Sequence, residues 1–249
     1  MGPPEVTANR TRPAFYAARP GGWRDWWTVL HPPYTAWHLS YVVVGACVAP
    51  TVTVSRLLAT LLAFFLAVGI AAHAYDELQD RPLGTHIPTW ALVTACVGGL
   101  AGALVLGAFG VAEVGLVLLP FLVAGPLLVI AYNADLFHGA FHTDLGFALA
   151  WGAFPVLTAY VAQAGDLSGA AALASVGATA LSLAQRSLST PARQLRRKVV
   201  DVCGTVVFDD GAEHRLDRER LLEPLERGLR ALAWAVVLFA AALAVFRLG

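Results

Sequence analysis

The stretch Leu57–Tyr75, LLATLLAFFLAVGIAAHAY, has 19 residues without a formal charge and is followed at once by Asp76-Glu77-Leu78-Gln79-Asp80. At about 1.5 Å per residue, a helix of this length crosses the roughly 30 Å hydrocarbon core of a bilayer. Acidic side chains at the mouth of such a helix are costly to place and often mark a functional site. The stretch therefore predicts a transmembrane helix with a polar site at its end.

Apolar blocks of the same kind recur along the whole chain. Of its 249 residues, 57% are hydrophobic and 14% are charged, whereas a soluble domain has about 25% charged residues. Because backbone groups in lipid must be paired within the chain, we expect one all-α, polytopic membrane domain over residues 1–249. The seven predicted spans are roughly Trp37–Val54, Leu57–Tyr75, Ile87–Phe109, Val111–Tyr132, Leu145–Ala164, Ser168–Leu183 and Leu229–Leu248.

Basic residues are distributed unequally between the two sides of these spans. The N-terminal tail and the loops 76–86, 133–144 and 184–228 together carry 14 of the 17 basic residues, Arg230 follows on the same side at the start of the last span, and the other side carries Arg56 and Arg247. Loops rich in arginine and lysine stay in the cytoplasm. We therefore expect an integral protein of the cell membrane with a cytoplasmic N-terminus and a cytoplasmic functional face. The formal net charge of zero argues against nucleic acid as a partner.

Two segments outside the spans have a recognisable pattern. Residues 1–33 lack the apolar core of a signal peptide and contain three tryptophans, which is typical of an interfacial segment. Residues 184–228 form a polar, cytoplasmic insertion before the last span. Within it, Gly204–Phe208 and Glu213–Leu216 flank the turn sequence Asp209-Asp210-Gly211, which predicts a β-hairpin. A charged amphipathic helix is expected over 217–228.

The acidic sequence after Tyr75 is the first candidate for a site. On a helix, His73, Asp76, Glu77 and Asp80 are spaced by three and four residues and share one face. A metal or metal-diphosphate site is the functional interpretation, and a solvated helix end is the simpler one. The loop 133–144 on the same side adds further polar groups, which are Asn133, Asp135, His138, His142 and Asp144.

A basic stretch follows the sixth predicted span. Ser189-Thr190-Pro191 resembles the start of a helix. Arg193, Arg196 and Arg197 then lie on one face and, with Arg186, are suited to binding a diphosphate by charge-assisted hydrogen bonds. Attachment to anionic lipid is the alternative role of the same cluster.

These features resemble the UbiA-type membrane prenyltransferase superfamily over roughly residues 25–200. Its members are helical bundles, usually of nine spans, and their first signature is Asn-Asp-x-x-Asp-x-x-x-Asp, often followed by Arg-Pro. The matching stretch here is Ala72–Asp80 followed by Arg81-Pro82. Asp76 and Asp80 match the last two acids, while Ala72 and His73 replace the first two residues.

The resemblance implies a function and a set of site residues. Family members bind a prenyl diphosphate through Mg²⁺ and transfer the prenyl chain to a lipophilic acceptor, or cyclise it. By this analogy Asp76 and Asp80 bind Mg²⁺ and, with Asp135, form the catalytic acids. The implied substrate-binding residues are His73, Arg81, Asn133, Arg186 and Arg193.

The chain also departs from the family pattern. No Asp or Glu occurs from Leu167 to Val200, where the second acidic motif is expected, and the chain has two spans fewer. Two other functions therefore remain open. One is a non-catalytic isoprenoid- or lipid-binding or assembly protein on the same bundle. The other is a membrane enzyme with a transition metal bound by histidine and aspartate, for which His73, Asp76, His138 and His142 are the candidate ligands.

Overall fold

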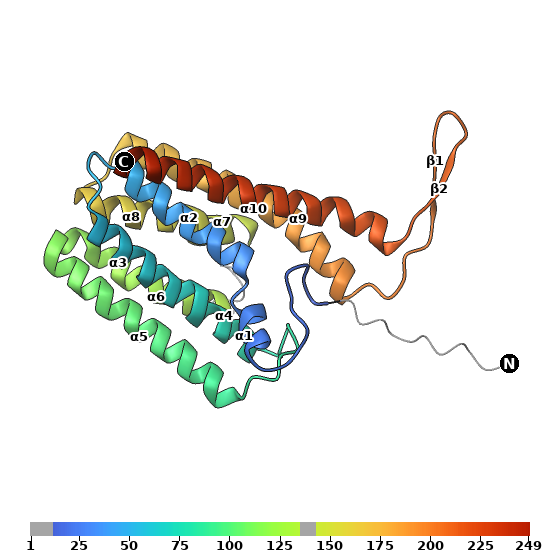
Figure 1. Cartoon of the computed structure of the whole chain (residues 1–249), viewed down its shortest axis with the longest axis horizontal. Coiled ribbons are helices and arrows are strands. Elements are labelled where there is room, and N and C mark those ends of the chain that lie inside the picture. Colours follow the sequence, from blue (N-terminus) through green and yellow to red (C-terminus); the bar gives the residue numbers. More distant parts are fainter. Residues whose placement is uncertain (1–11, 135–142) are drawn as a thin grey trace.

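The structure, a computed structural model, describes residues 12–134 and 143–249, and most of them are helical (Figure 1). The helices lie side by side as an elongated bundle, with a small β-hairpin projecting beyond one end. The elements in chain order are α1 (Trp23–Val29), α2 (Pro32–Val48), α3 (Val54–Phe64), the π-helix η1 (Phe65–Ala72), α4 (His73–Leu78), α5 (Thr89–Val114), the 3-10 helix η2 (Leu116–Leu118), α6 (Leu119–Asn133), α7 (Asp144–Ala148), the π-helix η3 (Leu149–Ala153), α8 (Phe154–Ala164), α9 (Gly169–Arg197), β1 (Thr205–Val207), β2 (Glu213–Arg215) and α10 (Arg218–Leu248).

Five continuous helical stretches in the described part of the chain are long and apolar enough to cross a membrane. They are Val54–Leu78, Thr89–Val114, Leu116–Asn133, Asp144–Ala164 and Arg218–Leu248. Large apolar side chains such as Phe109, Trp234 and Phe239 are exposed on them. Exposed apolar faces of this extent are compatible with helices that face lipid rather than water.

The predicted count of seven spans is not confirmed. The first predicted span corresponds to α2, which has 17 residues and ends at Val48, shortly before Pro50. The sixth corresponds to the first half of α9, which is rich in alanine, glycine and serine and continues into a basic C-terminal half. The third and fourth predicted spans are divided at Gly115, whose φ of 112° ends α5, and not near Gly110.

Helix α2 lies at the centre of the bundle and contacts α3, α8, α9 and α10. Its Gly45 lies so close to α8 that a Cβ atom there would be 2.2 Å from the carbonyl oxygen of Val156. Gly152 makes a similar approach to α9, and Gly99 of α5 approaches the carbonyl oxygen of Leu66. Small residues at helix crossings are typical of membrane bundles, because they let the backbones approach closely and gain dispersion contacts.

The two isolated basic residues lie at the end of the bundle away from the hairpin. The Arg56 Nε donates to Glu113 at 2.8 Å, and Arg247 Nη2 donates to the carbonyl oxygens of Ala49 and Pro50 at 2.7 and 2.8 Å. The C-terminus lies at this end, whereas α1 and the hairpin lie at the other (Figure 1). The uneven charge distribution in the sequence is therefore also a difference between the two ends of the molecule.

The structure confirms part of the secondary structure that the sequence predicts for the insertion 184–228. The β-hairpin is confirmed, with Val206 opposite His214 in an antiparallel pair. The charged helix is also confirmed, since α10 begins at Arg218 and runs without a break into the apolar segment. The predicted helix start at Ser189-Thr190-Pro191 is wrong, because α9 continues through Pro191. Packing of Ala192 against Leu222 and Leu229 of α10 outweighs the local signal.

The contact between α2 and α8 generates a prediction for stability. Gly45→Ala places a methyl group against the backbone of Val156, which no rotamer change relieves. We expect the free energy of unfolding to fall by about 1–3 kcal/mol, the usual cost of overpacking. The measurement is the urea or thermal unfolding midpoint of the purified protein in one fixed detergent.

The matched control is Gly98→Ala in α5, where an added Cβ meets nothing within 4 Å. Alanine is favoured over glycine in a helix by about 1 kcal/mol, so this variant should be as stable as the parent protein or more stable. Equal destabilisation by both substitutions would contradict the assignment of Gly45 to a close helix crossing.

Candidate functional site

A polar cavity of about 220 Å³ lies at the end of the bundle that also bears α1 and the hairpin. The N-terminal segment, α2, α4, α6, α9 and α10 all contribute side chains to its wall. Its polar and aromatic lining residues are Phe15, Tyr16, His31, Tyr34, His38, His73, Asp76, Tyr132, Asn133, Phe147, Trp151, Gln185, Arg186, Ser189, Arg193, Arg196, Arg197 and Glu226. Four arginines against two carboxylates make this wall suited to an anion.

The cavity contains five of the eight residues that sequence reasoning selected for the site. His73, Asp76, Asn133, Arg186 and Arg193 line it. The predicted catalytic residue Asp135 lies outside the described residues, as do His138 and His142. Asp80 and Arg81 are described and belong to the loop after α4. Neither residue lines the cavity that is formed by the described part of the chain.

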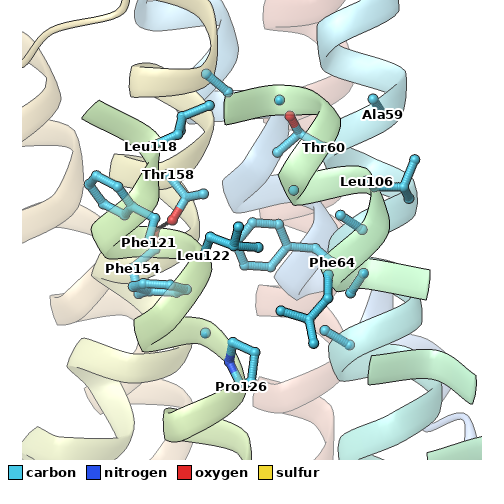
Figure 2. Close-up of a pocket in the computed structure, with 18 of the residues that line it drawn as sticks. Ala59, Thr60, Phe64, Leu106, Leu118, Phe121, Leu122, Pro126, Phe154 and Thr158 are labelled. Carbon is cyan, nitrogen blue, oxygen red and sulfur yellow. Dashed lines mark hydrogen bonds between the residues drawn. The ribbon is translucent and has the colours of Figure 1, made fainter. Parts of the chain in front are cut away.

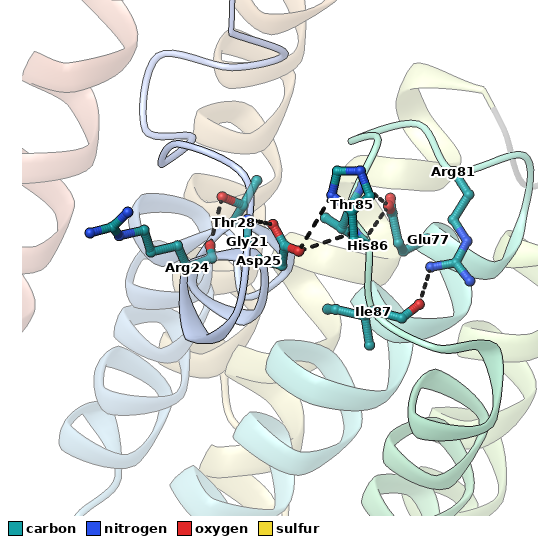
Figure 3. Close-up of polar contacts among 9 residues, drawn as sticks. All are labelled: Gly21, Arg24, Asp25, Thr28, Glu77, Arg81, Thr85, His86 and Ile87. Carbon is teal, nitrogen blue, oxygen red and sulfur yellow. Dashed lines mark hydrogen bonds and ion pairs between the residues drawn. The ribbon is translucent and has the colours of Figure 1, made fainter.

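The reason for this separation is the end of α4 at Leu78. Asp80 and Arg81 have φ values of 57° and 51°, so the chain leaves the helix before Asp80 can share a face with Asp76. Arg81 instead donates to the carbonyl oxygen of Ile87 at 2.6 Å (Figure 3). It also donates to the Thr89 hydroxyl at 3.0 Å. Arg81 therefore closes the loop that leads into α5. The helical face that the sequence predicted for Asp76 and Asp80 together is therefore not formed, and their shared magnesium role stays a prediction.

Glu77 was grouped with the same acidic face, but it has a structural role. Its side chain is completely buried and accepts hydrogen bonds from the backbone N–H groups of Leu83 and Thr85 and from the Thr85 hydroxyl, at 3.0, 2.9 and 2.7 Å. Asp25 of α1 acts similarly by accepting from the backbone N–H groups of Gly21 and His86 (Figure 3). These two carboxylates attach α1 and the loop 79–88 to the bundle.

The arginines of the cavity wall differ in what they bind. Arg186 donates to Asp144 at 2.6 Å and to the Tyr132 hydroxyl at 3.1 Å, and it lies 4.8 Å above the Phe147 ring. Arg196 forms a two-point ion pair with Glu226. These two side chains are therefore held in place by their partners.

Arg193 and Arg197 form fewer hydrogen bonds with the described residues than Arg186 and Arg196 do. Among the described residues, no hydrogen bond or ion pair of the Arg193 side chain is found, and Arg197 donates only its Nε, to the carbonyl oxygen of Pro13 at 3.3 Å. Burial lowers the pKa of Arg197 from its usual value, an effect that nearby Tyr16 opposes. Arg193 and Arg197 therefore present the guanidinium groups that a bound anion can reach.

His31 lies at the start of α2 in a strained conformation. Its φ of 48° is in the left-handed region, which costs a non-glycine residue about 1–3 kcal/mol and is found most often at functional sites. The ring stacks on that of His73 with 4.4 Å between centroids, and its Nδ1 is hydrogen-bonded to the Tyr16 hydroxyl at 2.5 Å. Burial, followed by the effects of His73, Arg197 and Arg193, lowers the pKa of His31 well below 6.5. The ring is therefore neutral at pH 7.

His38 lies deeper in α2, between the cavity and the centre of the bundle. Its Nδ1 is 3.1 Å from the carbonyl oxygen of Trp151, and its ring packs against those of Trp151 and Phe64. The buried Nε2 atoms of His38 and of His31 have no hydrogen-bond partner within the described part of the chain. Buried polar atoms of this kind are rare and call for an explanation.

An apolar groove of about 180 Å³ lies among α3, α5, α6 and α8 (Figure 2). Phe64, Leu122 and Phe154 project into it from α3, α6 and α8. Val68 and Trp151 line both the groove and the polar cavity, so the two spaces meet at these side chains. Both residues belong to π-helical turns, η1 and η3, and such wide turns occur most often at functional sites.

The described residues contain no group of three or more histidine, cysteine, aspartate or glutamate side chains arranged to hold a metal ion. Mg²⁺ is usually bound through one or two carboxylates together with phosphate oxygens of a substrate. Asp76 is a carboxylate of the cavity wall and is suited to this use, and Glu226 is paired with Arg196. The donor set fits a magnesium ion that arrives with a diphosphate better than an ion held by protein alone.

Sequence reasoning missed several cavity residues. The clearest case is His38, because it lies inside the first predicted span, where a lone histidine is itself an indication of function. Tyr16 was overlooked because the N-terminal segment carries no regular pattern.

No family model, no curated protein and no solved structure matches this chain.

The buried Glu77 gives a second prediction for stability. Glu77→Gln keeps the side-chain volume but replaces one carboxylate oxygen by an N–H₂ group. This group then faces a backbone N–H that donates to the carboxylate in the wild-type protein, so two donors meet without an acceptor. An unsatisfied buried donor costs about 1–3 kcal/mol, and we expect the free energy of unfolding to fall by that amount. The unfolding midpoint in detergent is the measurement.

Glu223→Gln is the control, because Glu223 pairs with Arg227 on the exposed face of α10. Exposed pairs at this helical spacing contribute about 0.3–0.5 kcal/mol, so the midpoint should change little. A loss as large as that of Glu77→Gln would argue against the structural role of the buried carboxylate.

The lowered pKa of His31 predicts a dependence of stability on pH. The folded state binds a proton at His31 less readily than the unfolded state. The stabilisation is therefore complete above about pH 6.5 and is lost as the pH falls below it. His31→Asn tolerates the left-handed conformation and should reduce the slope of stability against pH by up to about one proton. Thermal unfolding at several pH values measures this slope, and an unchanged slope in His31→Asn would contradict the prediction.

Proposed function

We propose that this protein binds an isoprenoid diphosphate and acts as a membrane prenyltransferase or a related cyclase. The observation that carries the proposal is the junction at Val68 and Trp151, where a basic polar cavity meets an apolar groove. A single molecule with an anionic head and a long apolar tail matches both spaces at once. Neither a purely polar nor a purely apolar ligand accounts for their connection.

The diphosphate is placed against the basic wall of α9. Arg193 and Arg197 lie one turn apart and supply guanidinium groups that hydrogen-bond to phosphate oxygens, while Arg186 adds positive charge from the preceding turns. Positive charge at this position stabilises a diphosphate that departs with the electron pair of the broken carbon–oxygen bond. A magnesium ion bound with the diphosphate supplies further charge neutralisation, and Asp76 is the cavity residue that would hold it.

The proposal also adds two membrane helices to the five long apolar ones. We propose that α2 and the first half of α9 also lie within the bilayer, as inner helices of a seven-span bundle. The cavity then opens toward the cytoplasm, because the end that bears it also bears most of the basic residues. Isoprenoid chains are poorly soluble in water, so their site belongs where the groove faces lipid.

A non-catalytic isoprenoid-binding protein is the second candidate. The separation of Asp80 from the cavity and the absence of acids from Leu167 to Val200 favour it, because fewer carboxylates are present to hold magnesium. The two candidates differ in one measurement. A prenyltransferase releases inorganic diphosphate from a bound prenyl diphosphate when acceptor is present, and a cyclase releases it without an acceptor, whereas a binding protein returns the ligand unchanged.

Binding of farnesyl diphosphate to the full chain in nanodiscs tests the proposal. With Mg²⁺ present, farnesyl diphosphate should bind more tightly than inorganic diphosphate or farnesol, because only it occupies both spaces. Asp76→Asn and Arg193→Ala should each weaken binding by about 10- to 100-fold, which is the loss of one charge-assisted contact of about 1.5–3 kcal/mol. Ala63→Phe fills the groove and should weaken binding of farnesyl diphosphate but not of inorganic diphosphate.

Two control variants separate the geometry from general charge effects. Asp80→Asn and Arg220→Ala both remove a charge from an exposed position outside the cavity wall, and both should change the affinity by less than about twofold. If wild type binds farnesyl diphosphate no better than farnesol at any Mg²⁺ concentration, the proposed function is wrong. An equal loss in Asp80→Asn and Asp76→Asn would support the family motif over the observed geometry.

A further inference from the structure

His38 occupies the boundary between the polar cavity and the apolar groove. It lines the cavity, and it packs against Phe64 and Trp151, which line the groove. Its side chain is only 6% exposed. In the proposed function this boundary is where the first carbon of the prenyl chain meets the diphosphate, so His38 lies where the bond is broken.

The hydrogen bond to Trp151 fixes the state of the His38 ring. A carbonyl oxygen only accepts hydrogen bonds, so Nδ1 must carry the proton that it donates to the Trp151 oxygen at 3.1 Å. In the neutral imidazole the second nitrogen, Nε2, then has a lone pair and no proton. The contact with Trp151 also prevents the ring from turning over, which would exchange the two nitrogens.

The lone pair of Nε2 has no donor to bind within the described part of the chain, although the atom is buried. A buried acceptor without a partner is costly, and a ligand that supplies a hydrogen bond recovers that cost. The required ligand group is a donor such as a hydroxyl. A phosphate oxygen does not meet the requirement, because a deprotonated phosphate has no proton to donate.

We propose that His38 binds the hydroxyl group of the acceptor substrate through Nε2 and removes its proton during transfer. This inference rests on the proposed function. The acceptor oxygen forms a bond to the first prenyl carbon while the bond from that carbon to the diphosphate oxygen breaks. The diphosphate leaves with the electron pair, and the hydroxyl proton passes to Nε2. The resulting imidazolium keeps its Nδ1 hydrogen bond to Trp151, so the ring stays in position as it becomes charged.

Phenol and anisole provide the test, since they share size and shape but only phenol donates a hydrogen bond. Their binding is measured by calorimetry on the full chain in nanodiscs, both without a donor and with the unreactive donor analogue farnesyl thiodiphosphate. Wild type should prefer phenol by about 10-fold, the value of one hydrogen bond to a buried acceptor. A site with an unpaired polar group discriminates in this way against an analogue that lacks the partner group.

The variant His38→Asn retains an N–H group near the position of Nδ1 but lacks the Nε2 acceptor. It should lose the preference for phenol over anisole. With farnesyl diphosphate as donor, release of inorganic diphosphate that depends on phenol should fall by about 100-fold or more, the usual contribution of a general base. Ser40→Ala is the control, because Ser40 is about as buried as His38 on α2 and its hydroxyl donates to the carbonyl oxygen of Ala36.

Each outcome decides between two claims. If wild type does not prefer phenol, or if His38→Asn keeps the preference, the role of His38 is wrong even when farnesyl diphosphate binds normally. The wild-type comparison stands without any variant, so a poorly folded His38→Asn protein does not leave the question open. If wild type prefers phenol but does not bind farnesyl diphosphate, the hydroxyl site of His38 is supported and the proposed function is overturned.

Discussion

The close approach of α2 to α8 is the constraint on which the rest of the structure depends. Gly45 permits this approach because it has no side chain, and the carbonyl oxygen of Val156 occupies the space that a methyl group would need. His38 lies seven residues earlier, which is about two helical turns, so it projects from the same face of α2. The contact at Gly45 therefore holds His38 against Trp151. A wider separation of the two helices would break the one hydrogen bond that orients the ring.

The π-helical turns η1 and η3 belong to the same arrangement. A π-turn displaces the helix that follows it and leaves room beside it, and both turns lie at the junction of the cavity and the groove. Val68 and Trp151 come from these turns. The irregular backbone is placed where a ligand site needs space, and the regular helices around it supply the apolar contacts.

The N-terminal segment and loop 79–88 form a layer over the basic end of the bundle, and buried carboxylates hold this layer in place. Glu77 and Asp25 use their oxygens on backbone N–H groups, so they fix loop 79–88 and the N-terminal segment rather than binding a ligand. This fixed layer carries Tyr16 and His31 to the cavity, where His31 stacks on His73. Acidic residues adjacent in sequence thus have opposite roles, since Asp76 faces the cavity and Glu77 faces the loop.

The sequence by itself determined that the chain is mainly helical, with long apolar helices and one β-hairpin. Uninterrupted apolar runs predict helices because unpaired backbone groups are too costly in lipid, and turn residues at Asp209-Asp210-Gly211 predict the hairpin. Helical spacing also placed His73 with Asp76 and grouped the arginines of α9. Only the tertiary structure decided that Asp80 leaves that face, that Arg81 closes a loop and that His38 reaches Trp151. Local periodicity relates residues within one turn or two, whereas a site joins residues more than a hundred positions apart whose proximity depends on how helices pack.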